Sequence, residues 1–151
     1  MIDLAEHVAE VLNVGPGTRV FEVDCGAGDF LYPFQINGYL VGGCDMSADA
    51  IQIAAAAMPG GMFQQGTAAA LDPAVPFDVV VWRSLASVAD EDIIRGIVAR
   101  MFAKATHAIA LLDAPEPRQS WLLRVLVEVG ANAIQFEAAS APDRVNAFAR
   151  V

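Results

Sequence analysis

Short apolar runs alternate with amphipathic segments along most of the chain, which is typical of an α/β protein. Runs rich in β-branched and aromatic residues predict strands at residues 20–23, 39–44, 62–65, 76–82 and 106–113. Helical periodicity, or a composition that favours helices, predicts helices at residues 3–13, 30–37, 48–58, 91–105 and 118–129. Period-two alternation at residues 131–137 and 145–151 predicts a terminal antiparallel hairpin.

The stretch from Arg19 to Asp45 reads as a βαβ unit with a ligand site. Its first strand ends at Cys25-Gly26-Ala27-Gly28, whose small residues let the backbone turn tightly and let a ligand approach the main chain. Asp29 is predicted to cap the following helix, and Pro33 falls in its first turn. The helix start offers unpaired N–H groups, and Asp45, at the tip of the second strand, can accept both hydroxyls of a ribose. The unit therefore predicts a nucleoside-like ligand, with NAD and S-adenosylmethionine as the candidates.

The glycine spacing argues against NAD. A dinucleotide fingerprint reads G-x-G-x-x-G/A, and this chain has Leu31 where the third small residue should allow close helix–strand packing. Asp29 would also place a negative charge near a pyrophosphate. An NAD-binding protein is kept as the weakest alternative.

The residues from Glu22 to Gly28 resemble motif I of the class I S-adenosylmethionine-dependent methyltransferases, in particular small, type-11-like domains. The wider similarity ends at Asp45-Met46-Ser47 and extends, with the closing hairpin, over the whole chain. It implies one domain (1–151) with a Rossmann-like, three-layer sandwich: a doubly wound, mostly parallel sheet with a C-terminal antiparallel hairpin. It also implies S-adenosylmethionine as cofactor, S-adenosylhomocysteine as product and a small-molecule acceptor. The helix at 3–13 would either cap the cofactor or cover the sheet edge.

The same resemblance implies a cofactor site. Glu22 would fix the glycine turn or meet the methionine amine, and Asp45 would bind the ribose. Thr67 replaces the acid of a Gly-Asp-Ala segment, so its hydroxyl or the N–H of Ala68 would bond the adenine. The predicted cofactor residues are Glu22, Asp24, Cys25, Gly26, Ala27, Gly28, Asp45, Met46, Thr67, Ala68, Trp82 and Arg83.

Two of these residues have alternative interpretations. Trp82 is either a core aromatic or a wall of the pocket. Arg83 either binds an acidic acceptor or the methionine carboxylate, or pairs with a surface acid. Asp113, Ser84 and Ser87 are candidates for acceptor contacts or structural residues, and no catalytic base is predicted.

Asp24 departs from the family pattern, because it stands where the family has a small residue and would crowd the methionine end. It is either a tolerated variant or, together with Thr67, a sign of a catalytically weak or inactive subunit that serves as a scaffold. The loops after Asp113 and around Ser140 are too short to form a lid. The first helix, a second subunit or a large acceptor would then have to exclude water from the site.

The composition limits the kinds of partner that we expect the protein to bind. The chain is 56% hydrophobic and 18% charged, so a folded domain is expected, with an apolar surface covered in a homo-oligomer or by a partner subunit. The net charge of −9 and the scattered basic residues argue against nucleic acid and anionic membranes. No apolar run of membrane-spanning length or secretory signal is seen, so a cytoplasmic location is expected. Cys25 and Cys44 are expected to be reduced, buried thiols, and the isolated His7 and His107 indicate no metal site.

Overall fold

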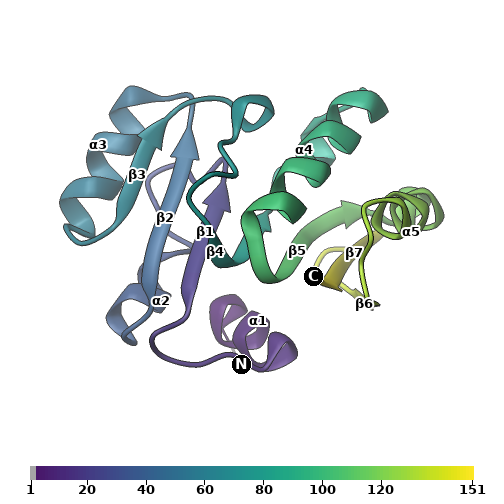
Figure 1. Cartoon of the computed structure of the whole chain (residues 1–151), viewed down its shortest axis with the longest axis horizontal. Coiled ribbons are helices and arrows are strands. Elements are labelled where there is room, and N and C mark those ends of the chain that lie inside the picture. The colour runs from purple at the N-terminus through teal and green to yellow at the C-terminus, as the bar shows by residue number, and fades with distance from the viewer. Residues whose placement is uncertain (1–2) are drawn as a thin grey trace.

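The computed structural model describes residues 3–151 as a seven-stranded sheet with helices on both faces (Figure 1). The strands are β1 (Arg19–Val23), β2 (Leu40–Asp45), β3 (Met62–Gln65), β4 (Phe77–Trp82), β5 (Ala105–Pro115), β6 (Ala133–Ala138) and β7 (Arg144–Arg150). The helices are α1 (Leu4–Leu12), α2 (Tyr32–Ile36), α3 (Ala48–Ala57), α4 (Glu91–Lys104) and α5 (Gln119–Glu128), with short 3-10 turns η1 (Ala68–Ala70), η2 (Leu85–Ser87) and η3 (Glu116–Arg118).

The strand order is β3-β2-β1-β4-β5-β7-β6. The pairs from β3 to β5 are parallel, whereas β7 runs antiparallel to both β5 and β6. The mostly parallel sheet and its closing antiparallel hairpin confirm the fold class predicted from the sequence.

Two apolar clusters, one on each face of the sheet, hold the layers together. Alternate residues of a strand point to opposite faces, so neighbouring positions of β4 serve different clusters: Val79 and Val81 face one side, Val80 and Trp82 the other. α1, α2 and α3 cover the first face, and α4 and α5 cover the second. Each large side chain buried there contributes roughly 1.5–3 kcal/mol.

α1 lies along a face of the sheet rather than over its edge. Asp3 caps the helix by accepting a hydrogen bond from the Ala5 N–H (2.9 Å), as predicted. Val8 and Leu12 are buried, but Leu4, predicted to lie on the same apolar face, is 39% exposed. Arg150 donates to the Leu12 carbonyl (2.8 Å) and fixes the far end of the helix near the start of β5.

Two local predictions were wrong. Asp29 does not cap α2, which begins at Tyr32 without a side-chain cap, because the turn is longer than expected. The Gly28 carbonyl accepts from both Leu31 and Tyr32, and Asp29 is left exposed within that turn. In addition, β5 does not end at Asp113; it continues to Pro115, which pairs with Arg144.

Within residues 3–151 we find no helix that combines the length and the apolarity needed to cross a bilayer.

Candidate functional site

The predicted cofactor residues gather where the strand order reverses, between β1 and β4. At such a switch point, the loops that follow the two strands diverge and leave a ligand site at the carboxyl edge. The glycine turn follows β1, Arg83 follows β4, and Asp45 ends β2. Neighbouring parallel strands therefore bring these three positions, which are far apart in sequence, to one edge.

Asp45 ties the tip of β2 to the glycine turn. Its Oδ2 accepts from the Gly26 N–H (2.9 Å), and its Oδ1 accepts from the Ser47 N–H (2.9 Å). The Gly66 N–H also donates to the Asp45 carbonyl (2.9 Å), which brings the end of β3 to the same place. Each carboxylate oxygen keeps a lone pair for a further donor, such as a hydroxyl.

The two glycines of the turn are needed for different structural reasons. Gly26 has φ +55°, and a Cβ there would meet nothing within 4 Å, so the main chain faces open space. Gly28 has φ +90°, and a Cβ there would lie 2.3 Å from the Cε of the buried Met58. Gly26 thus leaves room for a ligand, whereas Gly28 lets the turn pack against the end of α3.

Glu22 holds Arg83 instead of the glycine turn, which corrects one of its two predicted roles. Its Oε2 accepts from Arg83 Nε at 2.6 Å, and Glu22 is fully buried. Arg83 is thus paired with a buried acid rather than a surface one, and its guanidinium lies over the ring of Phe30, 4.9 Å from the centroid. Among residues 3–151, Glu22 Oε1 has no hydrogen-bond partner, although it is buried.

Burial raises the pKa of Glu22 from 4.5 to about 7, because the loss of solvent outweighs the attraction of Arg83. The nearby charges of Asp24 and Asp45 act in the same direction as burial. Glu22 is consequently poised between its neutral and charged forms at neutral pH.

We expect the free energy of unfolding to fall as the pH rises from about 4.5 to 7, and Glu22 should contribute roughly 3 kcal/mol to this fall. In this range the folded protein keeps a proton that the unfolded chain releases, so the contribution is present below pH 4.5 and lost above 7. Urea unfolding at several pH values measures it. The difference between wild type and Glu22→Gln should vary with pH across this window, and a constant difference would show that Glu22 does not titrate there.

Asp24 lies on the opposite face of the sheet from Glu22. Its backbone has φ +57°, and its Oδ2 accepts from the Trp82 indole Nε1 (3.0 Å). Trp82 is fully buried in the part of the core that faces α4, and this hydrogen bond satisfies the only donor of its side chain, the indole N–H. Burial raises the pKa of Asp24, the Asp45 charge adds to this, and the indole bond opposes it. The Asp24 carboxylate is thus held against Trp82, which is a core residue rather than an open pocket wall.

Asp24→Ala should therefore lower the free energy of unfolding by about 1–3 kcal/mol, because it leaves the buried Trp82 N–H without an acceptor. Asp24→Asn is the matched control, since asparagine keeps an acceptor oxygen and tolerates positive φ. Thermal unfolding compares the two variants. Equal losses in both would mean that the charge of Asp24, and not its hydrogen bond, matters.

The predicted adenine-contacting residues lie at the same edge. Thr67 is exposed and begins η1, Ala68 is buried beneath it, and Met46 is 67% exposed beside Asp45. Gln65 Nε2 donates to the Met46 carbonyl (3.1 Å), which links the ends of β2 and β3. The structure places these residues together, and their contacts with a cofactor stay a prediction.

No model of a protein family matches this sequence, and no curated protein matches it. Solved structures do. An amino pentose methyltransferase from Micromonospora echinaspora, with S-adenosylmethionine bound, is similar with a TM-score of 0.80 and 14% identity, over 97% of this chain and 89% of that one. The magnesium protoporphyrin IX methyltransferase of Synechocystis PCC 6803 is similar with a TM-score of 0.78 and 19% identity, over 97% and 77%. A methyltransferase of Methanosarcina mazei is similar with a TM-score of 0.74 and 15% identity, over 99% and 97%.

This chain has the fold of the class I S-adenosylmethionine-dependent methyltransferases. At these low identities, the fold is what the chains share.

The two cysteines in the methyltransferase fold are free and buried, as predicted. Burial is the main cause that raises the pKa of Cys25 to about 12 and that of Cys44 to about 11. Burial and the raised pKa values both favour the protonated thiol, which is the unreactive form. Among residues 3–151, no group of three or more His, Cys, Asp or Glu side chains is placed to hold a metal ion.

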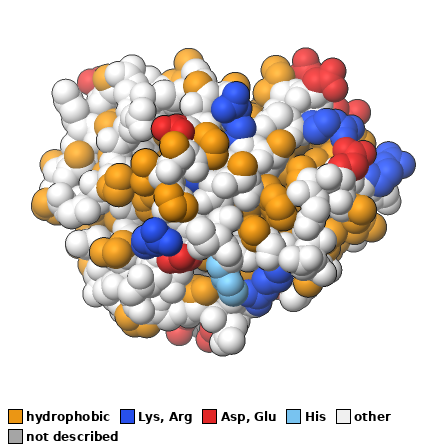
Figure 2. Space-filling view, viewed as in Figure 1, with side chains coloured by type: hydrophobic (Ala, Val, Ile, Leu, Met, Phe, Trp, Pro, Cys, Tyr) orange, Lys and Arg blue, Asp and Glu red, His pale blue; other side chains and the backbone are white. Residues whose placement is uncertain are grey.

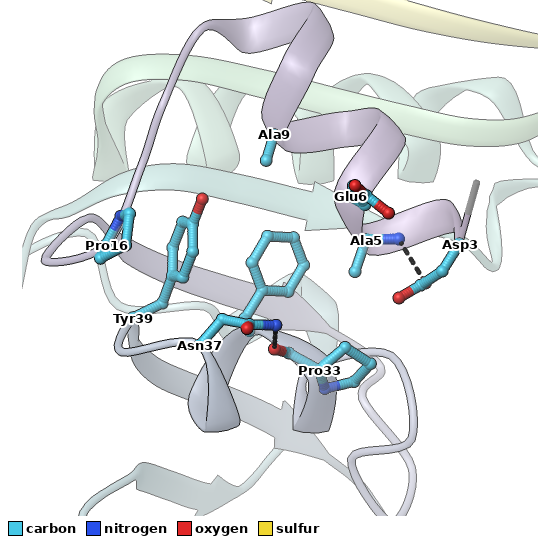
Figure 3. Close-up of a pocket in the computed structure, with 9 residues that line it drawn as sticks. Asp3, Ala5, Glu6, Ala9, Pro16, Pro33, Asn37 and Tyr39 are labelled. Carbon is cyan, nitrogen blue, oxygen red and sulfur yellow. Dashed lines mark hydrogen bonds between the residues drawn. The ribbon is translucent and has the colours of Figure 1, made fainter.

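Two cavities are lined by residues of α1. One, of about 370 Å³, separates α1 from α2; Figure 3 shows Glu6 and Ala9 on one side and Pro33 and Tyr39 on the other. The second, of about 290 Å³, is lined by Arg83, Asp113 and neighbouring residues at the carboxyl ends of β4 and β5. Neither cavity is lined by Gly26 or Asp45.

Proposed function

We propose that this protein binds S-adenosylmethionine at the carboxyl edge of β1 and β2 and catalyses methyl transfer to a small-molecule acceptor. The main observation behind the proposal is the position of the Asp45 carboxylate. It accepts a hydrogen bond from the Gly26 N–H (2.9 Å), and the space next to Gly26 is open. The likeness in fold to methyltransferases solved with S-adenosylmethionine or S-adenosylhomocysteine supports the same cofactor.

The residues present fit such a cofactor. Asp45 offers acceptor lone pairs to the two ribose hydroxyls, and Gly26 leaves its main chain open to the ligand. The unpartnered Glu22 Oε1 offers an acceptor near the turn, suited to an ammonium group. In this proposal, Thr67 and Ala68 contact the adenine. The proposed cofactor residues are those predicted from the sequence except Trp82, which is a fully buried core residue.

When bound, S-adenosylmethionine supplies a methyl group that passes from sulfur to the acceptor's nucleophilic atom, while the electron pair of the broken bond stays on the sulfur of S-adenosylhomocysteine. The protein's part is to place the acceptor in line and to exclude water. Leu4, at the start of α1, lines the cavity next to Arg83, so this end of the helix closes one side of the acceptor region. No side chain is assigned as a catalytic base.

Calorimetric titration with S-adenosylhomocysteine and, separately, with NAD tests the proposal. We expect the first ligand to bind and the second not to bind, because Leu31 is fully buried where a dinucleotide site needs a small residue. Binding of NAD alone would overturn the proposal.

A second candidate is a catalytically weak or inactive subunit of the same fold that acts as a scaffold. The observation in its favour is Asp24, whose charge lies at the turn where the resembling family has a small residue. Failure of both ligands to bind in the titration would favour this function.

We also propose that the protein is cytoplasmic and that a second copy or a partner subunit covers part of its surface. Leu40, Ile53 and Met62, from β2, α3 and β3, are each more than half exposed. Figure 2 shows hydrophobic side chains among few charged ones over the left part of the molecule, where Figure 1 places these elements. Light scattering coupled to size-exclusion chromatography should give a mass above that of one chain; a monomer with no partner would contradict this proposal.

A further inference from the structure

The cavity at the carboxyl ends of β4 and β5 lies on the opposite side of β1 from Asp45. It encloses about 290 Å³, enough for a small organic molecule. Leu4 and Leu112 give it apolar walls, and Arg83 and Asp113 are its charged groups. Under the proposed function, on which this inference rests, the cavity would receive the methyl acceptor.

Arg83 is held in a way that leaves its binding end available. Its Nε donates to Glu22 at 2.6 Å, and one face of its guanidinium lies over Phe30. Within residues 3–151, its terminal nitrogens Nη1 and Nη2 have no hydrogen-bond partner, and the side chain is 37% exposed. A guanidinium fixed at its Nε and on one face is preorganised to bind a planar anion through its remaining N–H groups.

The negative charge of Asp113, the other charged residue of the cavity, is balanced by a residue outside the cavity. The Asp113 carboxylate lies 3.7 Å from Arg144, and Arg144 also donates to the Asp113 carbonyl (3.0 Å). Asn146, a buried amide, accepts from the Asp113 N–H (3.0 Å) and donates to Glu137 (3.3 Å). Arg83 shares its charge with the buried Glu22, but its terminal N–H groups have no acceptor in the described residues 3–151 and are left to bind a ligand.

The backbone at this wall is strained. Asp113 has φ +59° and lies where the pairing of β5 with β7 shifts register, between Leu111 and Ala114. Backbone strain of this kind costs about 1–3 kcal/mol and is found mainly at functional sites. Asn146 and Arg144 hold the strained peptide from both sides, so the wall is fixed before a ligand arrives.

We propose that the ligand of this cavity, and thus the methyl acceptor, is a small organic carboxylate with an apolar body, and that Arg83 selects it through paired hydrogen bonds. Glu22 acts as a positioning residue, because it holds the guanidinium by its Nε. The apolar walls lower the local dielectric and strengthen the ion pair.

Calorimetric titration tests the proposed carboxylate specificity. Benzoate, phenylacetate and cyclohexanecarboxylate are titrated into the protein with and without S-adenosylhomocysteine, and benzyl alcohol is the uncharged comparison. We expect at least one carboxylate to bind at least about 10-fold more tightly than the alcohol. Arg83→Lys should retain only part of this preference, since lysine cannot bind bidentately. Arg124→Met, on the exposed surface of α5, removes the same charge and should change nothing.

Arg83→Met leaves Glu22 buried without its cation and risks misfolding, so the decisive pair is Glu22→Gln against Glu22→Gln/Arg83→Met. The preference should weaken but persist in the first, because the glutamine amide oxygen can still accept from Arg83 Nε, and it should disappear in the second. The inference is overturned if no carboxylate binds better than benzyl alcohol, or if the double variant keeps the preference. A loss of S-adenosylhomocysteine affinity in the double variant without any carboxylate binding would instead assign Arg83 to the cofactor. Failure of wild type to bind S-adenosylhomocysteine would count against the proposed function, and the carboxylate titration without it would still test Arg83.

Discussion

Gly28→Ala is expected to lower the free energy of unfolding by roughly 2–5 kcal/mol, whereas Gly26→Ala should cost only about 1–2 kcal/mol. Both substitutions force alanine into positive φ, so the backbone term is similar. Only at position 28 does the new methyl group meet another atom, the Cε of Met58 at 2.3 Å. Cε is the end of a flexible side chain, but Met58 is fully buried, so it must repack within the core under α3 to make room.

Chemical denaturation of the two single variants measures the difference directly. A double-mutant cycle with Met58→Ala identifies its cause, because the shortened side chain makes room for the methyl group. The cost of Gly28→Ala should fall close to that of Gly26→Ala in the Met58→Ala background. If the cost is unchanged there, or if the two glycine variants are equally destabilised, packing against α3 is not what requires Gly28.

Asp45→Asn should weaken binding of S-adenosylhomocysteine by roughly 10- to 150-fold, which corresponds to about 1.5–3 kcal/mol for a hydrogen bond to a charged group. Asparagine keeps the size of the side chain but replaces one acceptor oxygen with a donor, so both the ribose contact and the tie to the turn are weakened. Asp49→Asn, an exposed acid in the first turn of α3, removes the same charge and should leave the affinity unchanged.

The ribose contact can be separated from the structural tie by changing the ligand. Wild type should bind adenosine more tightly than 2′,3′-dideoxyadenosine, which lacks both hydroxyls. Asp45→Asn should lose this discrimination. If it keeps the discrimination while its thermal stability falls, Asp45 serves only to hold the glycine turn.

Much of the fold followed from local pattern. The strand at residues 62–65 was predicted with its observed bounds. The helix predicted from residue 48 begins there as α3, and Ser47 caps it by accepting from the Ala50 N–H. Such features depend on neighbours in sequence, where hydrophobic spacing and capping chemistry are readable. The prediction that Asp29 caps α2 was wrong, although it also relied on local sequence. Two main-chain hydrogen bonds to the Gly28 carbonyl extend the turn beyond Asp29.

The site was predicted less well, because its decisive contacts join distant residues. The pairing of Glu22 with Arg83 and the bond from Trp82 to Asp24 connect the ends of β1 and β4. The pairing of Glu22 with Arg83 could have been inferred from strand register. Glu22 lies beside Val81 where β1 pairs with β4, and Arg83, two residues after Val81, points to the same face of the sheet. The position of Asp45 beside the turn could be expected from the βαβ unit. That Asp45, and not Glu22, holds the turn at Gly26 depends on side-chain directions that no sequence pattern contains.

The central claim is that an adenosyl cofactor binds across Asp45 and the glycine turn. Backbone amide NMR spectra recorded during titration with S-adenosylhomocysteine test it most directly. The largest shifts are predicted at Gly26, Ala27, Met46 and Ala68. Shifts confined to the cavity between α1 and α2, or no shifts at saturating ligand, would contradict the claim.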